Sequence, residues 1–534
     1  MTRPHPGREK MKILLITGKI AEDSLRRYAS VSSHEVDVHA LPVSVAAFIT
    51  PEYAAREMSQ PWVSGYDMIL VPGTVRGDVS SIEDATGVPT FKGPTHASEV
   101  PVVLEHIGEI ELSRTTTATE LVRDVLRERA ISIIDDVEND WRNVLREGGG
   151  LIVGSGDRSV PIGREFPMRV IAEIVNAPTL DIAAVEKRAR YYEKQGADVI
   201  DIGMLAGKPM RGSIPGLVEA VRSSTKLPVS IDTLDPAEIM AAVESGVDLV
   251  LSLDAGNMEQ AAPHLDDTPV VVLPTNMRDG VILRTADERV TLLEKNISKA
   301  RGLGIQKIIA DPVLEPAIKP GLMESLRAYQ LFRTRNPDTP MLFGLGNVTE
   351  LIDADSPGVN GLLAALALEV EAELLFIPEY SVKARGSVRE TVDASRMMFL
   401  ARRNETPPKD LGVDLLVLKE KRWTEDEYDR SNEAKMRTVD AVREAHFAPD
   451  ERGWFKIQID RESSMIIVSH YAEKGDSPDA IVRGRSAEEI YQTIIREGLI
   501  GKMEHASYMG LELGKAEIAL LLGRSYSQDE PLFR

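Results

Sequence analysis

Carboxylate and amide side chains recur at the ends of short apolar runs in the middle of the sequence. Asp232 and Asp311 each end one such run, and Asn176 follows another. Clustered Asp oxygens are suitable ligands for a divalent cation, whereas any single one of them can cap the helix that follows. A carboxylate also accepts two parallel N–H bonds from a guanidine-like edge, such as that of a 2-amino-4-oxo pteridine. The residues alone leave these three interpretations open.

Other polar residues occupy comparable places along the same region. The second apolar run contains Asp201, the fourth carries Ser252, and the seventh leads into Asn347. Lys383 and Arg385 follow the last run. Asn side chains donate and accept hydrogen bonds, so they suit the remaining atoms of a flat polar ring.

The elements that position these residues are predicted from a regular repeat of apolar runs and amphipathic segments. The runs cover 168–174, 198–203, 228–233, 249–254, 269–275, 307–312, 340–346 and 373–379. Segments such as 182–195 and 287–304 between them have helical periodicity. Eight strand–helix pairs close a parallel (β/α)₈ TIM barrel, in which function gathers at the carboxyl ends of the strands. A doubly wound open sheet is the alternative, but it predicts fewer repeats.

Two further α/β and α+β regions flank the predicted barrel, which we place at 165–402. Residues 1–150 alternate strands (12–17, 35–41, 67–73) with helical segments, which predicts a small Rossmann-like α/β domain. The Gly- and Pro-rich stretch 148–167 is interpreted as a linker or a boundary loop. Residues 410–534 are interpreted as a small α+β domain. Its predicted elements are a strand at 413–420, a helix at 426–446, a hairpin at 455–472 and helices at 487–498 and 506–523.

Composition narrows the classes of partner. The formal net charge is −21, which argues against nucleic acid and against an anionic membrane surface as partners. No cysteine is present, so disulfides and thiolate chemistry are excluded. The N-terminal residues lack a signal-peptide core, and no stretch approaches the length of a membrane helix. We expect a cytoplasmic protein.

Several segments, taken in order, resemble dihydropteroate synthase and its relatives in the pterin-binding superfamily. The similar segments are IAEIVNAPTLD (171–181), QGADVIDIG (195–203), LPVSIDT (227–233), KIIADPVL (307–314) and LFGLGNVTEL (342–351). The resemblance implies that Asp232 and Asp311 bind a pterin. The flanking regions, including the C-terminal HASYMGLELGKAEIALLLGRSYSQD (505–529), resemble those of archaeal dihydropteroate synthase-related proteins.

The resemblance implies a transferase that joins a 6-hydroxymethyl-dihydropterin diphosphate to an arylamine, in the biosynthesis of tetrahydromethanopterin or a folate-like cofactor. Asn176, Ser252 and Asn347 complete the implied pterin site, with Mg²⁺ held through Asn176. Lys383 and Arg385 are the candidate ligands for phosphate or another anion. The resemblance also implies a homodimer. It assigns no catalytic residue and no role to either flanking domain.

Departures from the synthase pattern keep two alternatives open. The first loop, NAPTLD, is short, Ser252 stands where the family has Asn, and Val348 stands where synthases carry a Lys. GLGNV (344–348) is closer to pterin-dependent methyltransferases, which pass a methyl group from a tetrahydropterin to a corrinoid protein. A non-catalytic pterin-binding protein is the third hypothesis.

Overall fold

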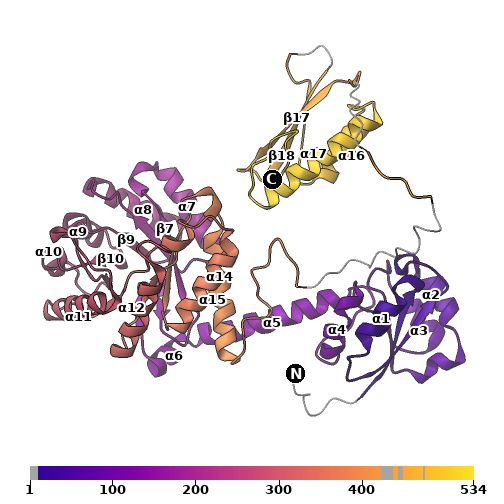
Figure 1. The fold of residues 1–534 in the computed structure, drawn as a ribbon, viewed down its shortest axis with the longest axis horizontal. Helices are drawn as coiled ribbons and strands as arrows, with labels where there is room; N and C mark the ends of the chain where they lie inside the picture. The colour runs from indigo at the N-terminus through magenta and orange to yellow at the C-terminus, as the bar shows by residue number, and fades with distance from the viewer. Residues whose placement is uncertain (1–9, 422–436, 443–448, 473–475, 534) are drawn as a thin grey trace. The chain divides into compact units, whose positions relative to one another are not determined.

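The structure is a computed structural model that describes residues 10–421, 437–442, 449–472 and 476–533 (Figure 1). The chain divides into two compact units, Met1–Glu427 and Tyr428–Arg534. The first contains an N-terminal α/β region and a barrel, and the second contains a small antiparallel sheet with two helices. In the part of the chain described, no helix is long and apolar enough to span a membrane.

The barrel lies between residues 169 and 403, all of which the structure describes. Each strand but one pairs in parallel with the next along the chain, and the last pairs with the first. A hydrogen bond of 2.8 Å from Ala310 N to Pro340 O closes the remaining gap. The strands are β7 (Arg169–Ile174), β8 (Val199–Gly203), β9 (Val229–Asp232), β10 (Leu249–Leu253), β11 (Val270–Val272), β14 (Ile308–Ala310), β15 (Leu342–Gly344) and β16 (Leu374–Pro378). The predicted (β/α)₈ barrel is confirmed.

Side chains alternate between the barrel interior and the helix layer because successive strand residues point to opposite faces. Ile171, Val199, Leu251 and Ile309 belong to the apolar cluster inside the barrel. Their neighbours along the strands, such as Ile200, pack with the surrounding helices. The same alternation places Glu173, Asp201, Asp232 and Asp311 on the inner face, one step further toward the carboxyl ends.

The helices cover the outside of the barrel (Figure 1). They are α7 (Ile182–Gln195), α8 (Ile214–Ser224), α9 (Pro236–Glu244), α10 (Met258–Ala261), α11 (Ala286–Gly302), α12 (Leu322–Arg335), α14 (Ser356–Glu369) and α15 (Ser387–Arg403). Asp181 caps α7, Asp235 caps α9 and Thr285 caps α11, each by accepting a hydrogen bond from a first-turn amide. Capping is therefore performed by loop residues here, and not by Asp232.

The stretch 148–167, predicted to be a linker, contains a two-stranded hairpin instead. β5 (Leu151–Val153) pairs antiparallel with β6 (Val160–Ile162). Val153 and Ile162 are fully buried in the apolar cluster inside the barrel. The linker prediction was wrong because the Gly and Pro residues shape a tight hairpin whose apolar residues close the amino end of the barrel.

The N-terminal region contains a four-stranded parallel sheet in the order β2-β1-β3-β4. These strands are β1 (Lys12–Gly18), β2 (Glu35–Leu41), β3 (Met68–Val71) and β4 (Thr90–Lys92). Its helices are α1 (Glu22–Ala29), α2 (Pro51–Met58), α3 (Ser80–Thr86) and α4 (Val100–His106). A long helix, α5 (Ala118–Asn139), continues through α6 (Trp141–Gly148) toward the barrel sequence. The predicted Rossmann-like domain is confirmed.

Helix α5 contacts the barrel directly. The Arg169 guanidinium, only 5% exposed, donates to both carboxylate oxygens of Glu138 at 2.6 and 2.9 Å. Phe166 and Phe399 pack with Ile134 and Val137 of the same helix. This helix is therefore packed against the barrel wall through both charge and apolar contacts.

The C-terminal unit contains the antiparallel strands β17 (Trp454–Asp460), β18 (Met465–Tyr471) and β19 (Ala480–Gly484), with helices α16 (Ala487–Arg496) and α17 (Met503–Leu521). The predicted α+β character is confirmed. The strand predicted at 413–420 is absent, and these residues form bends and irregular backbone. Most of the helix predicted at 426–446 lies outside the described residues, and its described part, 437–442, is not helical.

Candidate functional site

Three carboxylates meet inside the barrel near its carboxyl end. Glu173 on β7 pairs in register with Asp201 on β8, and Asp232 on β9 pairs with Gly203. One oxygen atom from each of the three carboxylates lies within 4.8 Å of the others. We call Glu173, Asp201 and Asp232 the acid cluster.

Asp201 is the most enclosed member of the acid cluster. It is 0% exposed, and its Oδ1 accepts a hydrogen bond of 2.6 Å from the Ser230 hydroxyl. Among the described residues, its Oδ2 has no hydrogen-bond partner. A buried carboxylate oxygen without a donor is costly, so this atom points to a ligand, a proton or a cation.

Gly203 leaves the space that the Glu173 carboxylate occupies. A Cβ atom at position 203 would lie 2.2 Å from Glu173 Oε1, far inside van der Waals contact. Only Gly203, without a side chain, therefore lets the Glu173 carboxylate extend beside β8. The strand register and this glycine together determine where Glu173 lies.

Burial and mutual repulsion favour the protonated forms of these acids. Burial, reinforced by the negative charges of Asp232 and Glu350, raises the pKa of Glu173 to about 8. Burial and the neighbouring Asp311 raise the pKa of Asp232 to about 7. Burial also raises the pKa of Asp201 well above its usual range. No ion pair joins the acid cluster to a described Lys, Arg or His, so protons neutralise these acids unless a cationic or N–H-rich ligand stabilises their ionised forms.

Asp311 follows β14 and faces the same end of the barrel. Its Oδ1 accepts from Val313 N at 2.7 Å and from the Tyr329 hydroxyl at 2.8 Å. Burial raises the pKa of Asp311 to about 6, although these two donors and Arg289 partly oppose the shift. Arg289 itself is buried and donates to the Val313 carbonyl at 2.7 Å, which holds the loop after β14 in place. The repulsion between Asp311 and Asp232 places both acids in the same electrostatic environment.

The polar side chains after β10 hydrogen-bond mainly to backbone groups of the neighbouring loops. Asp254 is buried, and its oxygens accept from the Gly256, Asn257 and Met277 amides and from the Thr275 hydroxyl. Asn257 in turn donates to the Ser252 carbonyl at 3.0 Å. Ser252 is buried at the end of β10. Its role in ligand binding stays a prediction.

Asn176 and Asn347 occupy loops at the same end. Asn176 has a left-handed backbone (φ 51°, ψ 39°), and its carbonyl accepts from the Thr179 amide and hydroxyl. Asn347, at the start of α13 (Gly346–Thr349), is exposed and donates from Nδ2 to the Leu314 carbonyl at 2.8 Å. Asn347 thus links the loops that follow β15 and β14.

Lys383 and Arg385 lie on the loop after β16. Lys383 hydrogen-bonds the Ile352 carbonyl and lies 3.4 Å from Asp353, so it is tied to the loop after β15. Arg385 is exposed. Burial is the main cause of the raised pKa of Tyr191, and the charge of Arg385 opposes that rise. Neither cation forms an ion pair with the acid cluster among the described residues.

The sequence analysis missed Glu173 and did not assign Asp201 to the site. The detectable signal was the alternation in VIAEI and VIDIG, where an acid occupies the inward position after an inward apolar residue. Charged residues in such an inward position are rare without a partner. That pattern distinguishes them from the acids that begin helices.

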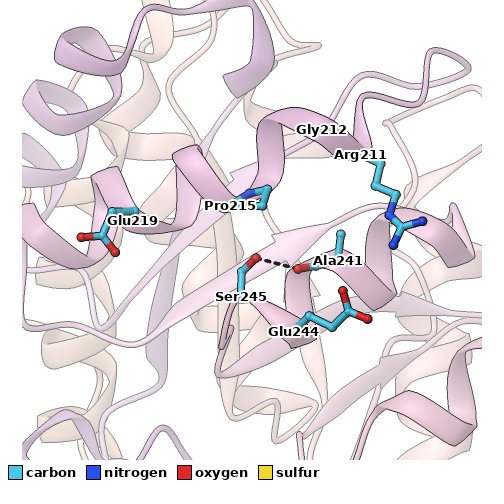
Figure 2. Close-up of a pocket in the computed structure, with 7 residues that line it drawn as sticks. All are labelled: Arg211, Gly212, Pro215, Glu219, Ala241, Glu244 and Ser245. Atoms are coloured by element: carbon cyan, nitrogen blue, oxygen red, sulfur yellow. Dashed lines mark hydrogen bonds between the residues drawn. The ribbon is translucent and has the colours of Figure 1, made fainter.

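A separate pocket of about 660 Å³ lies on the helix layer between α8 and α9 (Figure 2). Its lining consists of Arg211, Gly212, Pro215, Glu219, Ala241, Glu244 and Ser245. Ser245 donates its hydroxyl to the Ala241 carbonyl at 2.7 Å, which occupies that polar group within the helix. None of the acid cluster lines this pocket.

Family models match three parts of the chain. The model described as "Pterin binding enzyme" matches residues 176–353, which include Asn176, Asp232, Ser252, Asp311 and Asn347. A family of unknown function, DUF6513, matches residues 11–95, and the family PterinBD-DUF4346 matches residues 449–529. The barrel therefore carries a pterin-binding enzyme domain.

Related proteins match the chain to different extents. A protein of Methanocaldococcus jannaschii, named "Uncharacterized protein MJ0107", is 40% identical over 544 residues, covering 98% of this chain and all of that protein. A Ycf91-like protein of Nostoc sp. is 28% identical over 113 residues, covering 16% of this chain and 89% of that protein.

Solved dihydropteroate synthases align with about half the chain. The enzyme of Xanthomonas albilineans with 4-aminobenzoic acid is 19% identical, with a TM-score of 0.39, and the alignment covers 48% of this chain and 100% of that one. The enzyme of Yersinia pestis with a pterine-sulfa conjugate is 17% identical, with a TM-score of 0.38, and covers 47% and 100%.

Proposed function

We propose that this chain is a dihydropteroate synthase-type transferase. The chain belongs to the family of the Methanocaldococcus jannaschii relative and carries a pterin-binding enzyme domain. Its substrates are a 6-hydroxymethyl-dihydropterin diphosphate and an arylamine. The amine nitrogen attacks the methylene carbon, the carbon–oxygen bond breaks, diphosphate leaves, and the amine nitrogen releases one proton to solvent. The product belongs to tetrahydromethanopterin or folate-like cofactor biosynthesis, in the cytoplasm, and the active species is a homodimer.

The observation that carries this proposal is the group of inward acids at the carboxyl end of the barrel. Asp232 and Asp311 are half-buried carboxylates without an ion-pair partner among the described residues, and the strand ends hold them rigidly. The 2-amino group and ring N–H of a pterin together present two parallel donors to one carboxylate. Such a ligand supplies N–H donors to these inward carboxylates.

The remaining residues have supporting roles in this proposal. Asn176, Ser252 and Asn347 contact the ring or its substituent, with Mg²⁺ near Asn176 when diphosphate is bound. Lys383 and Arg385 stabilise the leaving diphosphate, because cations preorganised near developing negative charge lower the barrier. Holding both substrates in line supplies much of the remaining reduction of the activation barrier, since positioning alone can contribute about 7–11 kcal/mol.

The test is a substrate-pair assay with the purified full-length chain. We expect diphosphate release only when a 6-hydroxymethyl-dihydropterin diphosphate and an arylamine are both present. The amines to compare are 4-aminobenzoate and a ribofuranosyl-aminobenzene phosphate. Methyl loss from a methylated tetrahydropterin with a corrinoid protein, and no diphosphate release, contradicts the proposal. Tight pterin binding without either reaction contradicts the catalytic part alone.

A further inference from the structure

When its three acids are ionised, the acid cluster carries negative charge that no ion pair with a described positive side chain offsets. Glu173, Asp201 and Asp232 come from three consecutive strands, and no described Lys, Arg or His forms an ion pair with any of them. Buried carboxylates are found paired or bound to metals because an isolated buried charge is very unfavourable. A proton or a bound cation must therefore neutralise charge at this point of the barrel.

The geometry matches a cation bound by oxygen atoms. One oxygen from each acid lies within 4.8 Å of the other two. Oxygen ligands of one Mg²⁺ lie about 3 Å apart when adjacent and about 4 Å apart when opposite, and Ca²⁺ makes both distances slightly longer. Separations within 4.8 Å allow the three side chains to surround one ion.

An independent observation points to the same position. Asp201 is 0% exposed, and its Oδ2 has no hydrogen-bond donor among the described residues, although Ser230 satisfies Oδ1. Gly203 leaves the space that brings Glu173 Oε1 beside β8, where any Cβ would clash. One carboxylate thus carries an unsatisfied oxygen, and Gly203 leaves room for a second carboxylate of the same cluster.

We propose that Glu173, Asp201 and Asp232 bind one hard divalent cation, Mg²⁺ or Mn²⁺, with one oxygen each. Water completes the coordination, as is usual for Mg²⁺. The second oxygen of Asp232 stays available to a pterin N–H. Binding of the ion rests on the acid cluster alone, whereas its use in neutralising the diphosphate rests on the proposed function.

The experiment is a Mn²⁺ titration of chelator-treated full-length protein without pterin, in which the free ion is measured by electron paramagnetic resonance. We expect one site per chain that Mg²⁺ displaces. Glu173→Gln and Asp201→Asn each weaken this site at least about tenfold, because a charged ligand is lost. Glu379→Gln is the matched control and changes affinity less than about twofold, because the Glu379 oxygens already accept from Tyr191 and Val388 N.

Folding is checked by the melting temperature of each variant with and without Mn²⁺. Wild type and Glu379→Gln should gain stability with Mn²⁺, and the two cluster variants should not. Absence of a saturable wild-type site, or equal affinity in the cluster variants, overturns the inference and leaves the acids neutralised by protons. Metal binding without diphosphate release contradicts only the proposed function. Diphosphate release in metal-free protein with no Mn²⁺ site contradicts only the cation inference.

Discussion

The direction of the Asp232 side chain is determined by its position in strand β9. The side chain is inward because position 232 alternates with Ile231, which packs outward with the helices. An ionised, half-buried carboxylate on this face is unfavourable without a partner and is stabilised when a hydrogen-bond donor or a cation binds. The same atoms that destabilise the free protein therefore favour ligand binding.

The substitution Asp232→Asn tests this residue. It keeps the shape but removes the charge and one acceptor, so we expect the barrel to fold and reduced-pterin affinity to fall by about 1–3 kcal/mol. Calorimetry with 6-hydroxymethyl-dihydropterin measures the change. Asp338→Asn, the same substitution at an exposed residue near the amino end of β15, is the control. Equal affinity in Asp232→Asn and wild type would count against the pterin site.

The raised pKa of Asp311 predicts that pterin binding depends on pH. Its pKa is raised to about 6, mainly by burial, so the carboxylate is ionised above that pH and protonated below it. The ionised form accepts the pterin N–H donors. Affinity should therefore fall as pH drops through about 7, where Asp232 is protonated, and further through 6, where Asp311 is protonated, by up to about tenfold per pH unit for each acid. Asp311→Asn should bind weakly with a shallower slope, and a wild-type affinity that is constant across this range is inconsistent with the assignment.

At the scale of elements, the β5–β6 hairpin has a structural role that its composition concealed. Val153 and Ile162 complete the apolar cluster at the amino end of the barrel, below the acid cluster. The acids then lie above a packed layer and are not part of an open channel. The hairpin therefore supports the site from beneath without contributing a polar group to it.

The substitution Ile162→Ala tests the hairpin. It leaves a cavity in the barrel interior, so we expect a loss of about 2–5 kcal/mol in the free energy of unfolding. Urea denaturation followed by far-ultraviolet circular dichroism measures it. Ile282→Ala, at a side chain 57% exposed in the short strand β13 (Val281–Ile282), should change stability by less than about 0.5 kcal/mol. Similar losses in both variants would show that the hairpin does not close the barrel.

At the scale of the whole molecule, the C-terminal unit has its own core and its own electrostatic anchor. Phe455, Val468 and Leu513 belong to a cluster formed within this unit. Burial raises the pKa of Asp450, but donors from the Arg452, Gly501 and Lys502 amides and from His505 outweigh it and hold the pKa well below its usual range. Asp450 thus ties the start of β17 to the start of α17.

Acid should destabilise this unit selectively. A carboxyl whose folded pKa is depressed contributes stability above its unfolded pKa, about 4 for Asp, and loses that contribution as pH falls below it. We expect Asp450→Asn to destabilise the unit at neutral pH, and the difference from wild type to shrink below about pH 4. Hydrogen exchange of β17–β19 peptides measures this, with barrel peptides in the same sample as control. A difference independent of pH contradicts the anchor.

Local sequence pattern was sufficient for the architecture of this protein. The eight apolar runs became the eight barrel strands, and segments such as 182–195 became helices with nearly the predicted limits. Burial on both faces of a parallel strand and the 3.6-residue period of a helix are properties of contiguous residues, so they can be read from the chain. The same reasoning placed Asp232 and Asp311 at the ends of two strands.

Only the tertiary structure decided which of these groups meet. Glu173 joins Asp201 and Asp232 because the stagger between neighbouring strands sets them at one level, and Gly203 leaves room for the Glu173 carboxylate. The hairpin at 151–162 enters the barrel because its apolar residues find a cavity there, while the apolar stretch 413–420 has no sheet to join. Strand stagger and the availability of a packing partner depend on residues far apart in the chain, and local periodicity holds no information about them.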